Sequence, residues 1–368
     1  MTDIKRIGIL TGGGDCPGLN SVIRAVVRCA VLRYDMECIG VQDSFDGLIE
    51  GPAIIPLSWH RTKGLLFQGG TILGSTNRGD PFAYKVRVGE RIVEEDRSEA
   101  VMANVEKLEL GGLVIIGGDG TMAIADKFWE RKKLKLVGVP KTIDNDIWGT
   151  DETFGFHTAV EIATDAIARL QTTATSHHRV MILETMGRNA GWIALHAGVA
   201  SGADVILIPE IPFNLEAVVA KIKERSTRGS KSTIICIAEG AAPIGGTQIT
   251  REFVADSAEP VRLGGIAEWL SKELKGRIQT ECRYTVLGHI QRGGIPTGYD
   301  RILCTRLGTA AVHALANGEF GRMVALRENG IRTIPMSEIA GKNRFVDPGN
   351  DLLRAARDTG VYFGDEGA

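Results

Sequence analysis

Two carboxylates stand two residues apart in the segment 140–146, Pro-Lys-Thr-Ile-Asp-Asn-Asp. The apolar run 134–139 before it predicts a buried strand, and a chain leaving such a strand enters the ligand-binding edge of a parallel sheet. In extended backbone, side chains i and i+2 point the same way, so Asp144 and Asp146 are expected to face one ligand. One carboxylate can then accept a proton while the other holds a cation. The alternative is an Asx-rich turn whose side chains only cap backbone donors.

Two further apolar runs open into glycine-rich turns that carry an aspartate. Residues 113–116 lead into Gly-Gly-Asp-Gly-Thr at 117–121, and residues 7–10 lead into Thr-Gly-Gly-Gly-Asp-Cys-Pro-Gly-Leu-Asn at 11–20. Glycine lets the backbone approach a phosphate, and the helix that follows offers free N–H groups. Thr121 is expected to cap that helix, and Asp119 to bind magnesium directly or through water. Neither turn is a Walker loop, because no Gly-Lys-Ser or Gly-Lys-Thr follows, but together the turns favour phosphate and metal binding.

Arginines follow further predicted strands. Arg188 lies in Met-Gly-Arg-Asn-Ala-Gly-Trp at 186–192, where it is expected at the start of an apolar helix, and Arg292 lies in Gly-His-Ile-Gln-Arg-Gly-Gly at 288–294. Arg78 lies in the glycine-rich loop 69–80. A single arginine is most simply a surface ion pair, but guanidinium forks match phosphate oxygens, so the set predicts a polyanion site.

With these segments in this order, the chain resembles the 6-phosphofructokinase family. The resemblance rests on the turn at 11–20, Gly-Gly-Asp-Gly-Thr at 117–121, Pro-Lys-Thr-Ile-Asp-Asn-Asp at 140–146, Met-Gly-Arg at 186–188, Ala-Glu-Gly at 238–240 and Gly-His-Ile-Gln-Arg-Gly-Gly at 288–294. These motifs span most of the chain. Gly-Gly-Asp-Gly-Thr alone also occurs in the related NAD kinases and lipid kinases.

The resemblance implies a role for each matching residue. Asp144 matches the general base that accepts the proton of the sugar 1-hydroxyl, with Arg78, Thr142 and Arg188 as its catalytic partners. The positions matching the phosphoryl-donor site are Gly13, Gly14, Arg78, Gly117, Gly118, Asp119, Gly120, Thr121 and Lys141, with Asp119 and Asp146 around Mg²⁺. Those matching the sugar-phosphate site are Thr142, Asp144, Asp146, Arg179, Met186, Gly187, Arg188, Glu239, Arg283, His289 and Arg292. Arg179 and Arg283 match arginines that reach the 6-phosphate of fructose 6-phosphate across a subunit interface, which implies a homo-oligomer, either a dimer or a tetramer.

The two family positions that distinguish phosphoryl donors disagree in this chain. ATP enzymes usually have Gly at the positions of Gly120 and Lys141, whereas pyrophosphate enzymes usually have Asp and Lys. A side chain at position 120 would project into the space for the α-phosphate, while a flexible lysine can swing aside. We therefore expect ATP as the donor, with pyrophosphate as the alternative.

Length and composition agree with an enzyme of the cytoplasm, and the family resemblance implies that it acts in glycolysis. The 368 residues, 43% hydrophobic and 24% charged, can bury ample core, and the net charge of −2 argues against nonspecific nucleic-acid binding. An apolar run of about 18 residues is lacking, so a membrane span is not expected. The six cysteines form no CxxC pair and are expected to be reduced.

The repeated order of strand, glycine turn and helix predicts an α/β fold of two Rossmann-like domains, with mostly parallel sheets and helices on both faces. We expect a nucleotide and phosphoryl-donor domain of residues 1–155 plus 291–340, and a sugar-phosphate domain of residues 156–290 plus 341–368.

Two other functional classes fit parts of the sequence. A kinase of NAD or of a lipid would share the glycine-aspartate turn, but it would not need Arg188, His289 and Arg292 in this pattern. A noncatalytic sensor of sugar phosphate and nucleotide would not need Asp144. The sequence leaves open whether the sugar is fructose 6-phosphate or sedoheptulose 7-phosphate.

Overall fold

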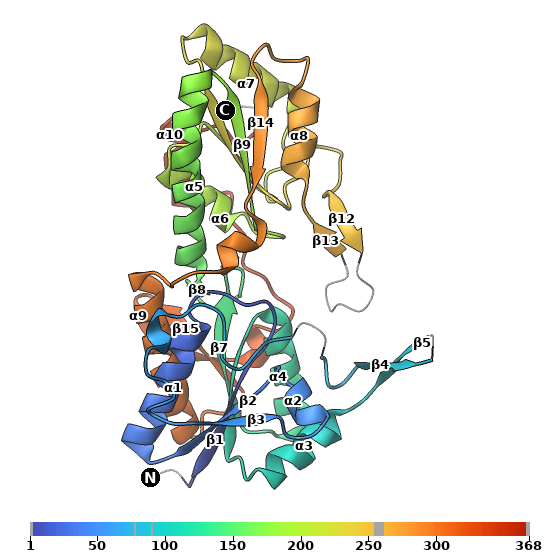
Figure 1. Ribbon diagram of the computed structural model, residues 1–368, viewed down its shortest axis with the longest axis vertical. Coiled ribbons are helices and arrows are strands. Elements are labelled where there is room, and N and C mark those ends of the chain that lie inside the picture. The colour runs from blue at the N-terminus through green and yellow to red at the C-terminus, as the bar shows by residue number, and fades with distance from the viewer. Residues whose placement is uncertain (1–2, 77–78, 90, 254–260, 366–368) are drawn as a thin grey trace.

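The computed structural model describes residues 3–76, 79–89, 91–253 and 261–365. Its two main β-sheets lie one above the other along the long axis of the molecule, each with helices on both faces (Figure 1). The predicted α/β class with mostly parallel sheets is confirmed. Within the described part of the chain, no helix is long and apolar enough to cross a membrane.

The larger sheet has eight strands in the order β16-β15-β7-β6-β1-β2-β3, with β8 paired to β7. The central pairs are parallel, and the edge strands β3 and β16 are antiparallel to their neighbours. These strands are β1 (Arg6–Thr11), β2 (Glu37–Val41), β3 (Ile54–Leu57), β6 (Gly112–Gly117), β7 (Leu136–Thr142), β8 (Phe154–Gly155), β15 (Arg322–Arg327) and β16 (Gly330–Pro335). Because central strands are buried on both faces, β1 and β6 read as continuous apolar runs.

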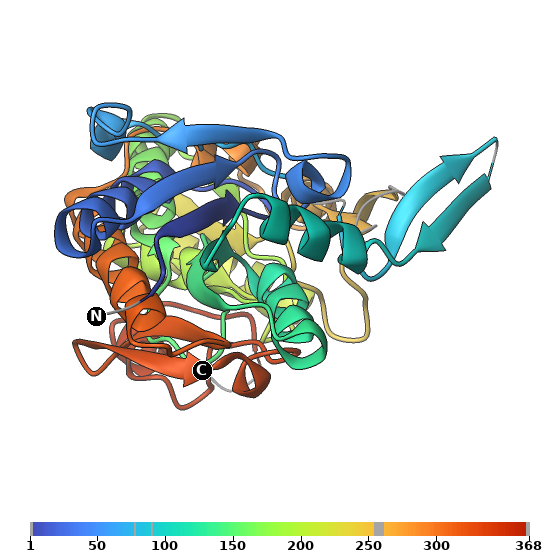
Figure 2. The same ribbon diagram turned by 90° about the horizontal axis from the view of Figure 1, so that it is seen from below.

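The smaller sheet has four parallel strands in the order β10-β11-β9-β14. They are β9 (Val180–Thr185), β10 (Val205–Leu207), β11 (Thr233–Ala238) and β14 (Cys282–Val286). Two separate hairpins complete the strands, β4 (Tyr84–Val88) with β5 (Arg91–Glu95) and β12 (Thr250–Phe253) with β13 (Val261–Leu263). The β4–β5 hairpin projects away from the body of the molecule (Figure 2).

The apolar core consists of three layers, which the two sheets separate and the helices cover. One continuous layer runs across both sheets and holds α1 (Leu19–Tyr34), α5 (Phe156–His177), α6 (Trp192–Ala200), α9 (Gly298–Ala316) and α10 (Asp351–Asp358). The opposite face of the larger sheet packs against α2 (Asp46–Ile49), α3 (Ser98–Lys107) and α4 (Asp119–Lys132). The opposite face of the smaller sheet packs against α7 (Leu215–Thr227) and α8 (Ile266–Leu274). The first layer therefore packs against both sheets and connects them, whereas the other two layers each belong to one sheet.

The chain passes between the two sheets three times. It leaves the larger sheet between β8 and α5, and it returns between η2 (Gly288–Arg292) and α9. After η3 (Met336–Glu338) it crosses again to α10, and Tyr362 then bridges to Val205 in β10. The short helix η1 (Leu65–Phe67) packs beside α1. These crossings lie close to the predicted domain boundaries, although the division into two domains stays a prediction.

Candidate active site

The loops that follow the parallel strands of the two sheets meet one another. Arg292, in η2 after β14, donates a hydrogen bond from Nη1 to the carbonyl of Asp15 in the glycine loop after β1, at 3.0 Å. A Cβ atom on Gly14 would lie only 2.9 Å from the same Nη1. The glycine at 14 therefore lets a guanidinium from the smaller sheet approach the backbone of the larger sheet, as predicted for a ligand site at strand ends.

Lys141 fills part of the space between these glycine turns. Its side chain is only 4% exposed, and its ammonium group donates to the carbonyl of Gly14 at 2.5 Å. A Cβ on Gly13 would lie 3.2 Å from Nζ, and one on Gly118 would lie 4.0 Å from it. Burial lowers the pKa of Lys141. The prediction that Lys141 is a flexible side chain that swings aside is wrong, because the lysine is held inside the proposed phosphate-binding cradle.

The aspartate loop after β7 is a turn and not an extended strand. The strand ends at Thr142, whose hydroxyl accepts a hydrogen bond from the backbone N–H of Asp144 at 3.1 Å. Asn145 has φ 54°, in the left-handed region, and its carbonyl accepts from Arg344 at 3.2 Å. The extended-backbone reason for placing Asp144 beside Asp146 is therefore wrong. The two carboxyl groups are nevertheless close enough for the charge of Asp144 to act on Asp146.

Asp119 begins α4 at the end of β6, and its charge also reaches Asp146. Burial raises the pKa of Asp146, and the negative charges of Asp144 and Asp119 raise it further. Three carboxylates from two strand ends therefore repel one another at this edge of the sheet. A bound cation would relieve that repulsion.

The turn at 117–121 differs from the prediction in the residue that precedes helix α4. The residue that precedes the first turn of α4 is Gly118, and Thr121 lies inside the helix, so the prediction that Thr121 caps it is wrong. Thr121 is 7% exposed, and its side chain packs against Gly117 and Gly12, where a Cβ would approach it to 2.4 and 2.9 Å. Gly120 is exposed, and a Cβ there would meet nothing within 4 Å.

On the smaller sheet, the segment 186–188 is fixed by backbone contacts with its neighbours. The N–H of Met186 donates to Gln291 Oε1 at 2.8 Å, and the carbonyl of Gly187, at φ 132°, accepts from Gly240 at 3.3 Å. A Cβ on Gly240 would lie 1.9 Å from the carbonyl oxygen of Arg188, so only glycine fits there. Helix α6 begins at Trp192, so Arg188 lies in the loop before the helix and not at its start. Sequence reasoning did not single out Gln291, although it lies within the motif of His289 and Arg292.

Glu239, at the end of β11, faces the aspartate loop of the other sheet. Burial raises the pKa of Glu239 to about 8, and the charges of Asp144 and Glu184 contribute to this shift. Arg292 acts in the opposite direction and lowers it. The structure thus brings together Asp144, Asp146, Asp119, Glu239 and Arg292. His289 is exposed on η2, three residues before Arg292.

Two of the predicted arginines lie away from this group. Arg179 precedes β9, whereas Met186 follows it, so the six-residue strand separates them by roughly 20 Å at about 3.3 Å per residue. Arg283 lies near the start of the parallel strand β14. Both arginines form ion pairs with Glu281, Arg179 at 2.5 Å. The structure does not bring Arg179 and Arg283 to the site of their own chain. Arg78 lies outside the described residues.

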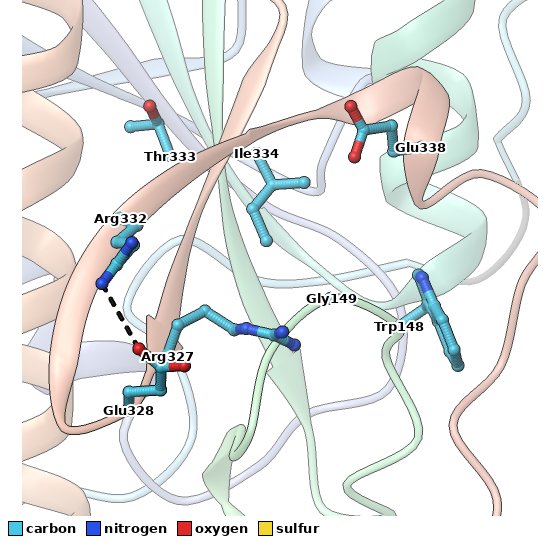
Figure 3. Close-up of a pocket in the computed structure, with 8 residues that line it drawn as sticks. All are labelled: Trp148, Gly149, Arg327, Glu328, Arg332, Thr333, Ile334 and Glu338. Atoms are coloured by element: carbon cyan, nitrogen blue, oxygen red, sulfur yellow. Dashed lines mark hydrogen bonds and ion pairs between the residues drawn. The ribbon is translucent and has the colours of Figure 1, made fainter.

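A hollow of about 320 Å³ lies elsewhere, against the β15–β16 hairpin (Figure 3). It is bounded by Trp148 and by Arg327, Arg332 and Glu338. Arg327 and Arg332 pair with Asp151 at 3.7 Å and with Glu328 at 3.4 Å. The hollow contains none of the predicted site residues, so we locate the active site from the convergence of charged groups and glycine turns.

A two-sheet α/β fold with glycine-aspartate turns opposite Arg292 suits an enzyme that transfers phosphoryl groups. The family model described as phosphofructokinase matches residues 6–315, and the chain belongs to this family. It is 50% identical over 367 residues to "ATP-dependent 6-phosphofructokinase 2" of Clostridium perfringens, covering 99% of this chain and 100% of that protein. It is 46% identical over 359 residues to "Pyrophosphate--fructose 6-phosphate 1-phosphotransferase" of Streptomyces coelicolor, covering 98% and 100%.

Among solved structures, the phosphofructokinase of Pichia pastoris in the T-state matches with a TM-score of 0.78 and 30% identity. That match covers 92% of this chain and 36% of the larger Pichia chain. The predicted family is confirmed.

Proposed function

We propose that this chain is an ATP-dependent 6-phosphofructokinase, which transfers the terminal phosphoryl group of MgATP to the 1-hydroxyl of fructose 6-phosphate. The observation that carries the proposal is that the charge of Asp144 acts both on Asp146 in its own loop and on Glu239 at the end of a strand of the other sheet. Lys141 and Arg292 hydrogen-bond to the glycine loop after β1 at the same meeting of loops. A relative with half of its residues identical carries the same activity in its name. As an enzyme of glycolysis, it would act in the cytoplasm.

In the proposed reaction, Asp144 accepts the proton of the 1-hydroxyl as that oxygen attacks the terminal phosphorus. The bond from this phosphorus to the bridging oxygen breaks, and ADP leaves with the electron pair. Phosphoryl transfer asks little covalent chemistry of the protein, so in-line positioning and charge neutralisation provide most of the catalysis. Lys141 and Arg292 supply positive charge at the meeting point of the two loops, and Arg188 and His289 are assigned to the sugar phosphate.

The residues present fit a magnesium ion that binds together with the nucleotide. Asp119 and Asp146 offer carboxylate oxygens, and Mg²⁺ commonly uses one or two carboxylates, with water and phosphate oxygens completing its shell. Burial and the negative charges of Asp144 and Asp119 already raise the pKa of Asp146, and a cation at this edge would offset those charges. When bound, Mg²⁺ would neutralise charge on the transferred phosphate.

Gly120 supports ATP as the donor. Because a Cβ there would meet no protein atom within 4 Å, the space beside this position is open to a ligand. Lys141 is held in the cradle by Gly14 and adds positive charge to a site for either donor. We therefore assign the choice of donor to Gly120 and not to Lys141, with pyrophosphate as the alternative donor.

We further propose that Arg179 and Arg283 complete the sugar site of a neighbouring subunit in a homo-oligomer. The length of β9 keeps Arg179 from its own site, and both arginines are charged groups held near the surface by Glu281. In this proposal, residues 1–155 plus 291–340 bind the donor, and residues 156–290 plus 341–368 bind the sugar phosphate.

A donor assay with the purified protein tests this function. ATP, ADP and pyrophosphate are each supplied with fructose 6-phosphate and with sedoheptulose 7-phosphate, and the phosphorylated sugar is measured. The highest kcat/KM is expected for ATP with fructose 6-phosphate. A higher kcat/KM with pyrophosphate would identify pyrophosphate as the donor in place of ATP. If no donor supports phosphorylation of either sugar, the proposed kinase activity is refuted.

A further inference from the structure

The aspartate loop contains a residue in the left-handed region. Asn145, between the two carboxylates, is 2% exposed and has φ 54°. Asparagine tolerates this region better than other residues with a Cβ, and its side chain can be fixed there by hydrogen bonds. The direction of Asp144 therefore depends on what holds Asn145 in place.

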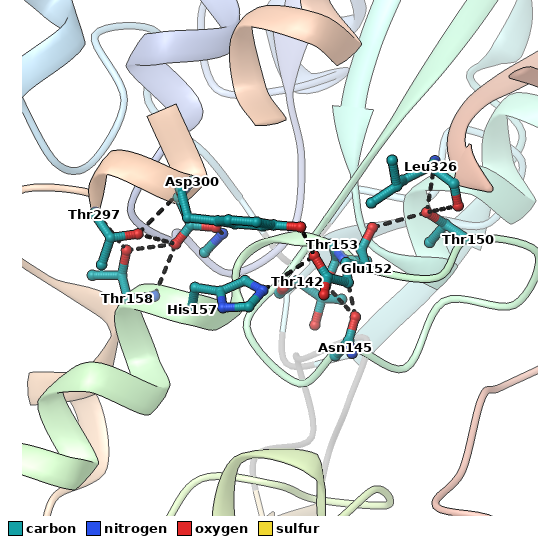
Figure 4. Close-up of polar contacts among 12 residues, drawn as sticks. Thr142, Asn145, Thr150, Glu152, Thr153, His157, Thr158, Thr297, Asp300 and Leu326 are labelled. Carbon is teal, nitrogen blue, oxygen red and sulfur yellow. Dashed lines mark hydrogen bonds and ion pairs between the residues drawn. The ribbon is translucent and has the colours of Figure 1, made fainter. Parts of the chain in front are cut away.

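Thr153 contacts the loop on both sides of Asp144. Its hydroxyl donates to the carbonyl of Thr142 at 2.8 Å, and its backbone N–H donates to Asn145 Oδ1 at 3.0 Å. Thr153 Oγ1 also lies 3.4 Å from Asn145 Oδ1. Thr153 is fully buried. Thr153 thus links Thr142, at the end of β7, to Asn145, the left-handed residue between the two aspartates (Figure 4).

Thr153 is itself anchored where the chain passes between the sheets. Two residues further on, the N–H of Gly155 donates to Asp300 Oδ1 at 3.0 Å, and Thr158 donates to Asp300 Oδ2 through its N–H at 2.8 Å and its hydroxyl at 2.6 Å. Asp300 is fully buried near the start of α9. The start of α5, two residues after Thr153, is therefore held by a carboxylate from the segment that returns to the larger sheet.

We propose that Thr153 is a positioning residue for the reaction, which holds the turn 142–146 so that Asp144 points at the sugar hydroxyl. The inference rests on the proposed function, because Asp144 is the base of that reaction. Thr153 touches no reacting atom in this account, and it acts only through Thr142 and Asn145. A small displacement of a catalytic group lowers turnover more than it lowers substrate binding.

The test compares Thr153→Val with Thr153→Ser and with a control threonine. Valine keeps the shape but loses the hydroxyl, while serine keeps the hydroxyl. Thr62 is a matched control: it is fully buried, and its hydroxyl donates to the carbonyl of Trp59 at 3.0 Å, in the segment between β3 and η1. Thr62→Val should therefore cost folding stability without disturbing the aspartate loop.

Two readouts are measured on the full chain. We expect Thr153→Val to lower kcat by about 10- to 100-fold, with KM for fructose 6-phosphate changed by less than about 3-fold. Hydrogen exchange of the amides in 142–146 should accelerate in Thr153→Val only. Thr153→Ser should restore both quantities, and Thr62→Val should keep kcat and loop exchange near those of the wild type.

The outcomes separate this inference from the proposed function. A Thr153→Val protein with wild-type kcat, or with a loop that exchanges no faster than in Thr62→Val, overturns the positioning role. A wild-type protein without sugar-kinase activity refutes the proposed function. In that case, faster loop exchange in Thr153→Val alone would still support the structural role of Thr153, and unchanged exchange would refute it.

Discussion

Gly120→Asp tests the assignment of donor choice to one position. An added Cβ meets no protein atom within 4 Å, and an aspartate in the first turn of α4 has a favourable interaction with the helix dipole. Folding should therefore be unaffected, and any loss of activity reports on the ligand. In the proposed site the new carboxylate lies beside the α-phosphate of ATP, which pyrophosphate lacks.

The size of the effect follows from Coulomb's law. Two unit charges about 5 Å apart, at an effective dielectric constant of about 20, repel by about 3 kcal/mol. This energy corresponds to a fall of roughly 150-fold in kcat/KM for ATP. Pyrophosphate should lose far less, because its two phosphates occupy the positions nearer to the sugar.

Steady-state kinetics with each donor measure the effect, with Gly120→Asn as the matched control. Asparagine adds the same bulk without the charge, so its loss of ATP efficiency should be clearly smaller. A thermal unfolding curve verifies that each variant is folded. Equal losses with ATP and pyrophosphate, or an unchanged efficiency with ATP, would refute the assignment of donor choice to Gly120.

Two further predictions concern assembly and pH. Mixing Arg179→Ala subunits with Asp144→Ser subunits should restore part of the activity, because some hybrid interfaces contain one complete site. If native mass spectrometry detects hybrids that have no activity, the sugar site is not shared between subunits. Burial alone would lower the pKa of His157, but the hydrogen bond and charge of Glu152, 3.1 Å away, outweigh it and raise this pKa. The pair therefore stabilises the fold below the ordinary histidine pKa, and this contribution is lost as pH rises through the raised value. Denaturant unfolding should show a loss of under about 1 kcal/mol over that range, absent in His157→Phe, and an equal loss in both proteins would contradict the pairing.

The parts of the fold that were predicted correctly come from local patterns. The apolar runs at 7–10 and 113–116 lie within strands β1 and β6, and the polar motifs follow their carboxyl ends. Short β-branched runs followed by glycine carry this information in a few neighbouring residues. The strand order and the shared core layer depend on contacts between distant segments, which no local pattern shows.

The wrong predictions at the candidate site also concern contacts that the local sequence does not show. Thr121 has the residue type of a helix cap, yet Gly118 takes that position while Thr121 packs on Gly12, far away in sequence. Lys141 looks flexible in the sequence, but it is buried because the loop after β1 closes over it. The side chain of Asn145 is held by the backbone N–H of Thr153, eight residues further on, and no periodicity signals such a contact.

The most direct test of the central claim is the turnover of Asp144→Asn with ATP and fructose 6-phosphate. Asparagine keeps the size of the side chain but cannot accept the proton, so kcat should fall by roughly two to four orders of magnitude. Binding of fructose 6-phosphate, measured by calorimetry, should change little. A variant that retains near wild-type kcat would remove Asp144 from the role of base and contradict the account of the site.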